Sequence, residues 1–252
     1  MVSGQPLSAV LITRNAAGQL AECLASLRFC DEIVVVDSAS EDATVEIAER
    51  HGARVVAAEW RGFGPMKQFA VEQAAHDWVL CIDADERVSE RLQQNILAGM
   101  SAPQFCAYRC ARRNRFMGRY LKHGEGYPDW SLRLFDRRAA RWSDDAVHEK
   151  VLATGPVGTL QGDLLHHSAE SLESYLAKQN RYSTLAATEA LVSGKRATVW
   201  HLLLSPLLRF IKFYFFRLGL LDGVPGLVHI LVGCVASFAK YAKMLAFERS
   251  GE

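Results

Sequence analysis

The chain has 252 residues, of which 50% are hydrophobic and 23% are charged, so it is long enough to bury the core of one substantial domain, with or without an appendage. The formal net charge of only +1 does not suit a nucleic-acid-binding protein. The six cysteines are scattered and lack zinc-finger spacing, so we expect reduced thiols in a cytosolic protein and no structural zinc.

The first six residues are polar and lead directly into an apolar run. They do not show the basic stretch followed by an apolar stretch that is typical of a secretory signal. We therefore expect catalysis on the cytoplasmic side.

The first third of the chain alternates strand-like and helix-like segments. Apolar runs predict strands at residues 7–13, 32–36, 53–58 and 78–82, and apolar residues at helical spacing predict helices at residues 18–27, 42–51 and 66–75. This alternation is typical of a mainly parallel sheet with helices on both faces. We therefore expect an α/β fold.

Polar residues stand at the carboxyl ends of the first two predicted strands, where open α/β sheets bind their ligands. They are Thr13, Arg14 and Asn15 after the first strand, and Asp37, Ser38 and Asp42 after the second. A carboxylate at Asp37 can accept hydrogen bonds from a ribose or a base, and the small residues behind it let a ligand approach. Asp42 also suits a helix cap, which would explain it equally well.

A glycine-containing loop follows the third predicted strand and enters the third helix with Lys67 in its first turn. This position suits contact with a diphosphate. The glycine and lysine spacing differs from that of a P-loop.

The most informative residues are Asp83, Ala84, Asp85 and Glu86, directly behind the strand at 78–82. Two carboxylates one residue apart can converge on one hard cation, because Mg²⁺ and Mn²⁺ take oxygen ligands from one or two carboxylates and from substrate phosphates. Alternatively, Asp85 and Glu86 simply open the next helix, since acids suit a helix N-terminus. These four residues alone leave both interpretations open.

From residue 105 to about 157, arginines, aromatics and glycines crowd together, among them Arg109, Arg112, Arg113, Trp130 and Arg133. Guanidinium groups pair with phosphates and stack on planar groups, so the segment suits an anionic, ring-bearing partner. A solvated basic face is the alternative.

Two adjacent histidines, His166 and His167, follow an apolar pair. Neighbouring side chains on a strand point to opposite faces. We therefore expect a hydrogen-bonded core histidine beside an exposed one, and not a pair of metal ligands.

From about residue 171 the pattern is helical, and after Val199 it becomes strongly apolar with interspersed Lys and Arg. Residues 223–239 carry no charge, but this length is at the lower limit for spanning a bilayer, and Pro225, Gly226 and Gly233 interrupt it. The pattern favours helices lying in a membrane interface beside anionic lipid. A buried oligomer interface or a cap over the catalytic domain is the alternative, with a true span in third place.

The order of these motifs resembles glycosyltransferase family 2, which has the GT-A fold. The likeness covers about residues 7–150 and rests on Thr-Arg-Asn, Val-Asp-Ser, Gly-x-x-Lys-Gln and Trp-x-Leu-x-x-Asp-Ala-Asp-Glu. Further motifs resemble the branch that holds the lipopolysaccharide core β-1,4-glucosyltransferases, which act on inner-core heptose. They are Tyr127-Pro128-Asp129-Trp130, Arg133-Leu134-Phe135, Val147-His148-Glu149 and Leu221-Asp222-Gly223.

The resemblance implies a Rossmann-like, mixed but mainly parallel sheet flanked by helices, followed by an amphipathic or apolar helical tail. We expect a catalytic domain at residues 1–165, with a donor half at about 7–100 and an acceptor half at about 101–165. A membrane-associating helical region is expected at residues 166–252.

The resemblance also implies roles for the donor residues. Asp37 would contact the uracil-ribose part of a nucleotide sugar, Asp42 would support that loop, and Lys67 would lie near the diphosphate. Asp83 would touch ribose or sugar, and Asp85 would bind the divalent cation, Mg²⁺ or Mn²⁺. The remaining donor-binding candidates are Thr13, Arg14, Asn15, Ser38 and Ala84.

The family also needs a general base, usually an acid in a Glu-Asp pair. The only match by position is His148-Glu149, which departs from that pair in order and composition. We assign the base to Glu149, with His148 beside it and Asp129 and Asp145 as competitors. Arg112, Arg113 and Arg133 are expected to contact the acceptor or the diphosphate.

The function implied is a metal-dependent inverting transfer of a hexose, glucose by the branch, from a UDP-sugar to the lipid-linked inner core of lipopolysaccharide. It would take place at the cytoplasmic face of the inner membrane. The alternatives are a polyprenyl-phosphate glycosyltransferase and a catalytically silent membrane-surface scaffold of the same fold. The residues themselves do not fix the sugar, and they leave open whether the chain forms a homo-oligomer.

Overall fold

The structure is a computed structural model that describes residues 4–145, 149–167 and 171–250. The chain divides into two compact units, which are described separately. The first comprises Met1–Arg112 and Asp129–His167, and the second comprises Arg113–Pro128 and Ser168–Glu252. The segment at 113–128, expected in the acceptor half of the catalytic domain, thus groups with the C-terminal helices.

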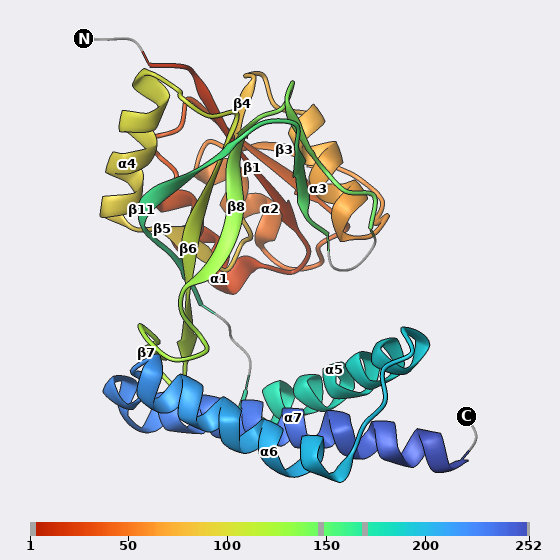
Figure 1. Cartoon of the computed structure of the whole chain (residues 1–252). Helices are drawn as coiled ribbons and strands as arrows, with labels where there is room; N and C mark the ends of the chain where they lie inside the picture. Colours follow the sequence, from red (N-terminus) through yellow and green to blue (C-terminus); the bar gives the residue numbers. More distant parts are fainter. Residues whose placement is uncertain (1–3, 146–148, 168–170, 251–252) are drawn as a thin grey trace. The chain divides into compact units, whose positions relative to one another are not determined.

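In the first hundred residues of the first unit, strands and helices alternate as the sequence predicts (Figure 1). The elements are β1 (Leu7–Thr13), α1 (Ala17–Ala25), β2 (Glu32–Asp37), α2 (Thr44–Arg50), β3 (Arg54–Ala57), α3 (Phe63–Glu72), β4 (Trp78–Cys81), β5 (Glu86–Val88) and α4 (Glu90–Ser101). The later strands are β6 (Ala107–Phe116), β8 (Asp129–Asp136), β9 (Ala140–Trp142), β10 (Val151–Ala153) and β11 (Val157–His166).

The main sheet has the strand order β3-β2-β1-β4-β8-β6-β11-β5. β1, β2, β3 and β4 pair in parallel, whereas β8 pairs antiparallel with both β4 and β6, and β11 pairs antiparallel with β5. β9 and β10 form a separate two-stranded antiparallel sheet. The predicted mixed sheet flanked by helices is confirmed, although among the described strand pairs parallel pairing is confined to β1–β4 and the pairs beyond β4 are antiparallel.

Side chains that alternate along the strands build a core on each face of the sheet, because successive strand residues point to opposite faces. Leu11, Val35 and Leu80 join the core formed with α1, α2 and α4. Val10 and Val34 join the core formed with α3 and β9. Both faces of the parallel half are therefore covered, and its ligand-binding edge lies where the strands end.

The second unit contains β7 (Arg119–Tyr120), which pairs with the end of β6, and the helices α5 (Leu172–Val192), α6 (Val199–Ile211) and α7 (Gly223–Ser250). A π-helical turn, η1 (Lys212–Phe216), and a 3₁₀ turn, η2 (Gly219–Asp222), join α6 to α7. Small residues of α5, including Ala187 and Ala190, pack with Met244 of α7.

A buried carboxylate explains why the segment at 113–128 belongs to this unit. Asp222 accepts hydrogen bonds from the backbone N–H groups of Lys122, at 2.9 Å, and His123, at 2.8 Å. Arg209 of α6 forms an ion pair with Glu125. The sequence suggests neither contact, because the partners lie about 100 and 84 residues apart.

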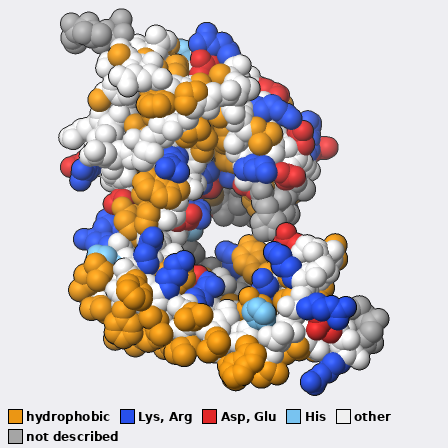
Figure 2. All heavy atoms as spheres, in the orientation of Figure 1, with side chains coloured by type: hydrophobic (Ala, Val, Ile, Leu, Met, Phe, Trp, Pro, Cys, Tyr) orange, Lys and Arg blue, Asp and Glu red, His pale blue; other side chains and the backbone are white. Residues whose placement is uncertain are grey.

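Two apolar stretches of the second unit, Val199–Phe216 and Gly219–Arg249, are long enough to cross a membrane by length and composition. No residue of the first stretch is buried within the structure. Figure 2 shows hydrophobic side chains gathered over the helices of this unit, with Lys and Arg side chains beside them.

Candidate active site

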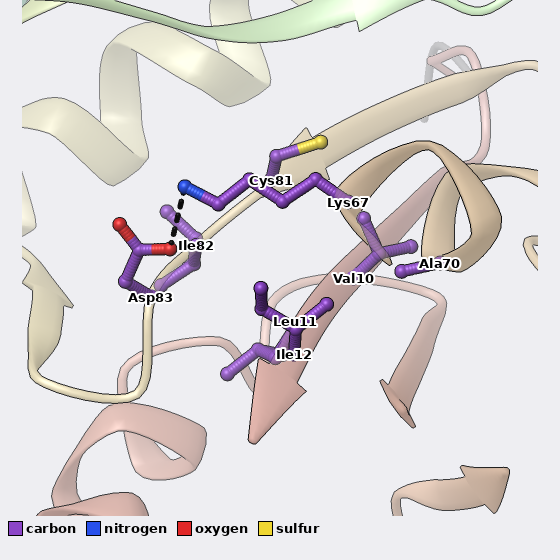
Figure 3. A pocket seen from close by; sticks show the side chains of 8 residues that line it. All are labelled: Val10, Leu11, Ile12, Lys67, Ala70, Cys81, Ile82 and Asp83. Carbon is purple, nitrogen blue, oxygen red and sulfur yellow. Dashed lines mark ion pairs between the residues drawn. The ribbon is translucent and has the colours of Figure 1, made fainter. Parts of the chain in front are cut away.

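A lysine bridges two carboxylates at the carboxyl end of β4. The Nζ of Lys67, from α3, lies 3.1 Å from Oδ1 of Asp83 and 2.8 Å from Oε1 of Glu149. Figure 3 shows the Lys67 side chain reaching across to Asp83 above the ends of β1 and β4. The structure therefore brings together an expected diphosphate contact, the first aspartate of the Asp-x-Asp motif and the expected general base.

Arg133 ties the same aspartate to a second acid. Its Nη2 lies 2.7 Å from Oδ2 of Asp83 and 2.6 Å from Oε1 of the fully buried Glu86. The β6–β8 register passes from Tyr108–Leu134 to Arg109–Leu132 and so skips Arg133. An extra residue in a strand re-aims its side chain. This irregularity directs the guanidinium toward the acids.

The charges and the burial of this cluster shift the pKa values of its carboxyl groups. Burial alone would raise the pKa of Asp83, but the positive charges of Arg133 and Lys67 outweigh it and hold that pKa well below its usual range. Burial raises the pKa of Glu86, against the opposing charge of Arg133. Asp83 is consequently the carboxylate that these cations keep ionised.

A cavity of about 370 Å³ opens beside the cluster. Its lining includes Lys67, Asp83, Arg133 and Glu149, together with Arg112, Trp130, Ser131, Leu132, Trp142, Lys150 and Val151. Concave sites of this size with a few converging polar groups are typical of small-molecule binding.

The segment that leads to Glu149 is fastened to the start of α3. The N–H of Gly64 donates to the carbonyl of Asp145 at 3.1 Å. A Cβ at residue 64 would collide with the carbonyl oxygens of Ser143 and Asp145, so only glycine allows this approach. Ser143 also exchanges hydrogen bonds with Lys150, the residue after Glu149, so the close contact at Gly64 helps to position Glu149 relative to Lys67.

The expected donor residues at the ends of β1 and β2 interlock. Asp37 accepts hydrogen bonds from the hydroxyl of Thr13, at 2.9 Å, and from the N–H of Ser40, at 2.9 Å. The N–H of Asn15 donates to the Ser40 hydroxyl at 2.8 Å, and the amide oxygen of Asn15 accepts from Glu41. The two strand ends thereby form one connected wall.

Two further donor candidates, Asp42 and Ser38, differ in their hydrogen bonding. Asp42 accepts hydrogen bonds from Ala17 and Thr44 and so connects the starts of α1 and α2, although the N-cap position of α2 is Ala43. The buried hydroxyl of Ser38 has no hydrogen-bond partner among the described residues. An orphaned polar atom in a ligand-binding wall is a group that a ligand can satisfy. Ala84 packs against the core.

An aromatic pocket at the end of β1 was not among the sequence predictions. Trp60 and Phe63 form an edge-to-face pair with ring centroids 4.8 Å apart, and with Ile12, Thr13 and Arg14 they line a cavity of about 350 Å³. Both rings are exposed. The sequence does carry a signal for this pocket, because two aromatic residues lie in the glycine-containing loop that follows the third predicted strand.

The second aspartate of the motif has a different partner from the first. Oδ2 of Asp85 lies 3.1 Å from Nε2 of His166, at the end of β11. Carboxylate and imidazole together suit a divalent cation such as Mn²⁺, with water and diphosphate oxygens as the remaining ligands. In the described part of the chain, no three or more His, Cys, Asp and Glu side chains are arranged to hold a metal ion by themselves. The expectation of one core and one exposed histidine at 166 and 167 is not met, because both are half-buried, and His166 faces the expected metal ligand.

The remaining candidates are divided between the two units. Arg112 pairs with Asp129, with Nη2 and Oδ2 2.7 Å apart, beside the cavity. Arg113 belongs to the second unit, where its guanidinium stacks on Tyr127 at 5.9 Å. His148 lies outside the described residues, and Asp145 is exposed.

Comparisons with known proteins agree with this geometry. The glycosyl transferase family 2 model matches residues 8–152. The chain is 34% identical over 253 residues to the lipopolysaccharide core biosynthesis glycosyltransferase LpsC of Rhizobium meliloti, covering 97% of this chain and 93% of LpsC. It is 31% identical over 259 residues to an uncharacterised glycosyltransferase of Rickettsia bellii, covering 94% and 85% of the two chains.

Among solved structures, S. aureus TarS 1–349 in complex with UDP superposes with a TM-score of 0.50 at 16% identity, covering 98% of this chain and 92% of that one. This likeness concerns the fold, because the sequence identity is low. The family match and the relationship to LpsC extend the likeness from the fold to the activity. The chain belongs to glycosyltransferase family 2, in its lipopolysaccharide core branch, and is a glycosyltransferase of GT-A fold.

Proposed function

We propose that the protein is a metal-dependent inverting glycosyltransferase that moves a hexose, glucose by its branch, from a UDP-sugar to a heptose of the lipopolysaccharide inner core. The observation that carries the proposal is the Asp83–Lys67–Glu149 bridge in the wall of the 370 Å³ cavity. The LpsC relationship supports the acceptor class, and the TarS complex supports UDP as the nucleotide.

In this proposal the donor nucleoside lies along the ends of β1 and β2. Asp37 and the free Ser38 hydroxyl offer hydrogen-bonding groups to ribose and base. Thr13, Arg14 and Asn15 complete the wall, and Asp42 supports it through Thr44. The exposed ring of Trp60 lies at the same strand end and offers a stacking surface to the base.

Asp85, oriented by His166, would hold the divalent cation, Mg²⁺ or Mn²⁺. When bound, the cation would neutralise the charge that develops on the departing diphosphate. Asp83 would meet the ribose or the donor sugar, held in position by Lys67 and Arg133. Because Arg133 is buried between two acids, we assign it a positioning role.

Glu149 would act as the general base. It would accept the proton of the acceptor hydroxyl while that oxygen bonds to the anomeric carbon on the face opposite the diphosphate. The bond from the anomeric carbon to the diphosphate oxygen would break, and UDP would leave with the electron pair. Asp129 is paired with Arg112 at the same cavity and remains the competing base. Arg112 would contact the acceptor or the diphosphate.

The C-terminal helices would hold the enzyme at the cytoplasmic face of the inner membrane, as a peripheral or monotopic protein. Exposed apolar residues of α6 recur at helical spacing and form one face, at Trp200, Leu203, Leu204, Leu207 and Leu208. Arg209, Lys212 and Arg217 follow in the next turns. An apolar face with basic residues beside it suits an anionic lipid surface, where the lipid-borne acceptor lies.

Product analysis tests the proposal. Purified protein with Mn²⁺ would be offered UDP-glucose, UDP-galactose and UDP-N-acetylglucosamine, each with heptose-terminated core lipid and, in parallel, with polyprenyl phosphate. We expect a hexosylated core lipid with inverted anomeric configuration, and no such product from Glu149→Gln. Transfer to polyprenyl phosphate alone would establish the alternative acceptor class. Binding of UDP without transfer to any acceptor would favour the silent scaffold.

A further inference from the structure

A large exposed aromatic ring stands at the cavity beside the reaction cluster. Trp130, in β8, is 47% exposed and lines the same cavity as Asp83 and Glu149. Asp129 and Arg133, on the same strand, both form ion pairs with charged groups of the site. A tryptophan left open to solvent beside a reaction cavity offers a wide apolar face to a ligand.

Arg109, which takes no part in the ion-pair cluster around Asp83, packs against the Trp130 ring. The guanidinium carbon of Arg109 lies 4.9 Å from the Trp130 ring centroid, and Nε of Arg109 donates to the Thr159 hydroxyl at 3.1 Å. These three residues come from the neighbouring strands β8, β6 and β11. Trp130 lines the cavity whereas Arg109 does not, so the arginine supports the ring without belonging to the cavity wall.

We propose that Trp130, backed by Arg109, is the platform on which a pyranose ring of the acceptor saccharide stacks. This inference rests on the proposed function and names a contact for its acceptor. One face of a pyranose carries mainly C–H groups, which pack on an indole and bury apolar area. The donor wall is built at the ends of β1 and β2, so the acceptor is the sugar that reaches the antiparallel strands β6 and β8.

The charges around the platform indicate which saccharides fit. Arg112 and Lys150 line the cavity with Trp130, in addition to Lys67 and Arg133 of the reaction cluster, and Arg109 adds a cation that stacks on the ring. Cations around an aromatic platform suit a sugar whose neighbouring residues carry phosphate or carboxylate groups. Core saccharide with its anionic groups is therefore expected to bind more tightly than the same saccharide after dephosphorylation.

Two readouts test the platform. In kinetics, Trp130→Ala should raise the KM for core saccharide about tenfold, equivalent to about 1.4 kcal/mol, while the KM for UDP-sugar stays within about twofold. Trp130→Phe should recover most of the loss, since it keeps an aromatic face. Leu97→Ala, which changes an exposed leucine of α4 that belongs to neither cavity, should leave the KM for the saccharide unchanged.

The second readout does not require transfer. Saturation-transfer NMR with lipid-free core saccharide, UDP and Mg²⁺ should show contact to sugar protons in the wild-type protein and its loss in Trp130→Ala. Equal saturation and equal KM in the two proteins would overturn the platform. Saccharide binding that depends on Trp130, in a protein that forms no product, would instead refute the proposed function and keep the platform. A wild-type protein that binds no core saccharide would overturn both.

Discussion

Arg133 and Glu86 form an ion pair that is almost completely shielded from solvent, with Nη2 and Oε1 2.6 Å apart. A buried pair of this kind contributes little in itself, but removing one partner leaves the other charge uncompensated, at a cost of about 3–5 kcal/mol. The pair therefore makes the position of Asp83 dependent on the integrity of the core.

We predict that Arg133→Met lowers the free energy of unfolding by about 3–5 kcal/mol, because both Glu86 and Asp83 lose their shared cation. The double variant Arg133→Met/Glu86→Gln should recover part of that loss. Urea denaturation followed by circular dichroism measures both. Arg138→Met, which removes an exposed partner of Asp136, is the control and should unfold at the wild-type midpoint. Equal midpoints for Arg133→Met and Arg138→Met would contradict the buried-charge argument.

The lowered pKa of Asp83 predicts a specific pH dependence. A carboxyl group whose pKa is lower in the folded than in the unfolded state stabilises the fold above its ordinary pKa, and the stabilisation disappears as the pH falls toward the folded value. Wild type should therefore exceed Asp83→Asn in unfolding free energy most strongly near neutral pH. The difference should shrink below about pH 4, the ordinary range for aspartate. Denaturation curves at several pH values would show it, and a difference independent of pH would count against the Lys67 and Arg133 contacts.

Gly64 gives a test of how Glu149 is positioned. Gly64→Ala places a Cβ against the carbonyl oxygens of Ser143 and Asp145, so we expect a destabilisation of about 1–3 kcal/mol and slower transfer as the segment leading to Glu149 shifts. Gly18→Ala is the matched control, because a Cβ in helix α1 meets nothing within 4 Å. It should stabilise the protein by about 0.5–1 kcal/mol. Thermal unfolding and transfer rates compare the two, and identical behaviour would refute the close approach.

The apolar face of α6 predicts membrane-surface binding. The double variant Leu203→Glu/Leu207→Glu should lose most binding to vesicles that contain phosphatidylglycerol, because each glutamate replaces apolar contact by repulsion from anionic lipid. Flotation of protein with vesicles measures the bound fraction. Leu97→Glu changes an exposed leucine of α4 and should float like wild type. If all three proteins float equally, α6 is not the attachment site.

The parallel half of the fold was predictable because local signals agree with it. The predicted strand at 7–13 coincides with β1, and the segments at 32–36 and 78–82 coincide with β2 and β4 to within one residue. The carboxyl ends of these strands then identify Asp37 and Asp83. The observed helix starts differ from the predicted ones by one to three residues. The largest difference is at α3, which begins at Phe63 directly after Gly62, whose φ is 96°.

The rest of the site depends on contacts between distant residues that no local pattern specifies. The skipped register at Arg133, expected as an acceptor or diphosphate contact, makes it the partner of a buried glutamate. His166 reaches Asp85 across 81 residues of sequence, and Lys67 reaches Glu149 across 82. Arg133 and His166 lie on the antiparallel strands β8 and β11, whereas Lys67 lies on helix α3 and Glu149 in a loop, so these contacts emerge only in the folded chain.

Calorimetric titration with UDP, with and without Mn²⁺, tests the central claim most directly. We expect metal-dependent UDP binding that is lost in Asp85→Asn and weakened in His166→Ala, because each removes a group from the proposed metal-binding pair. Asp144→Asn, which changes an exposed aspartate paired with Arg141, should bind as wild type does. A folded wild-type protein that binds no UDP, or binds it equally well without metal, would contradict the account.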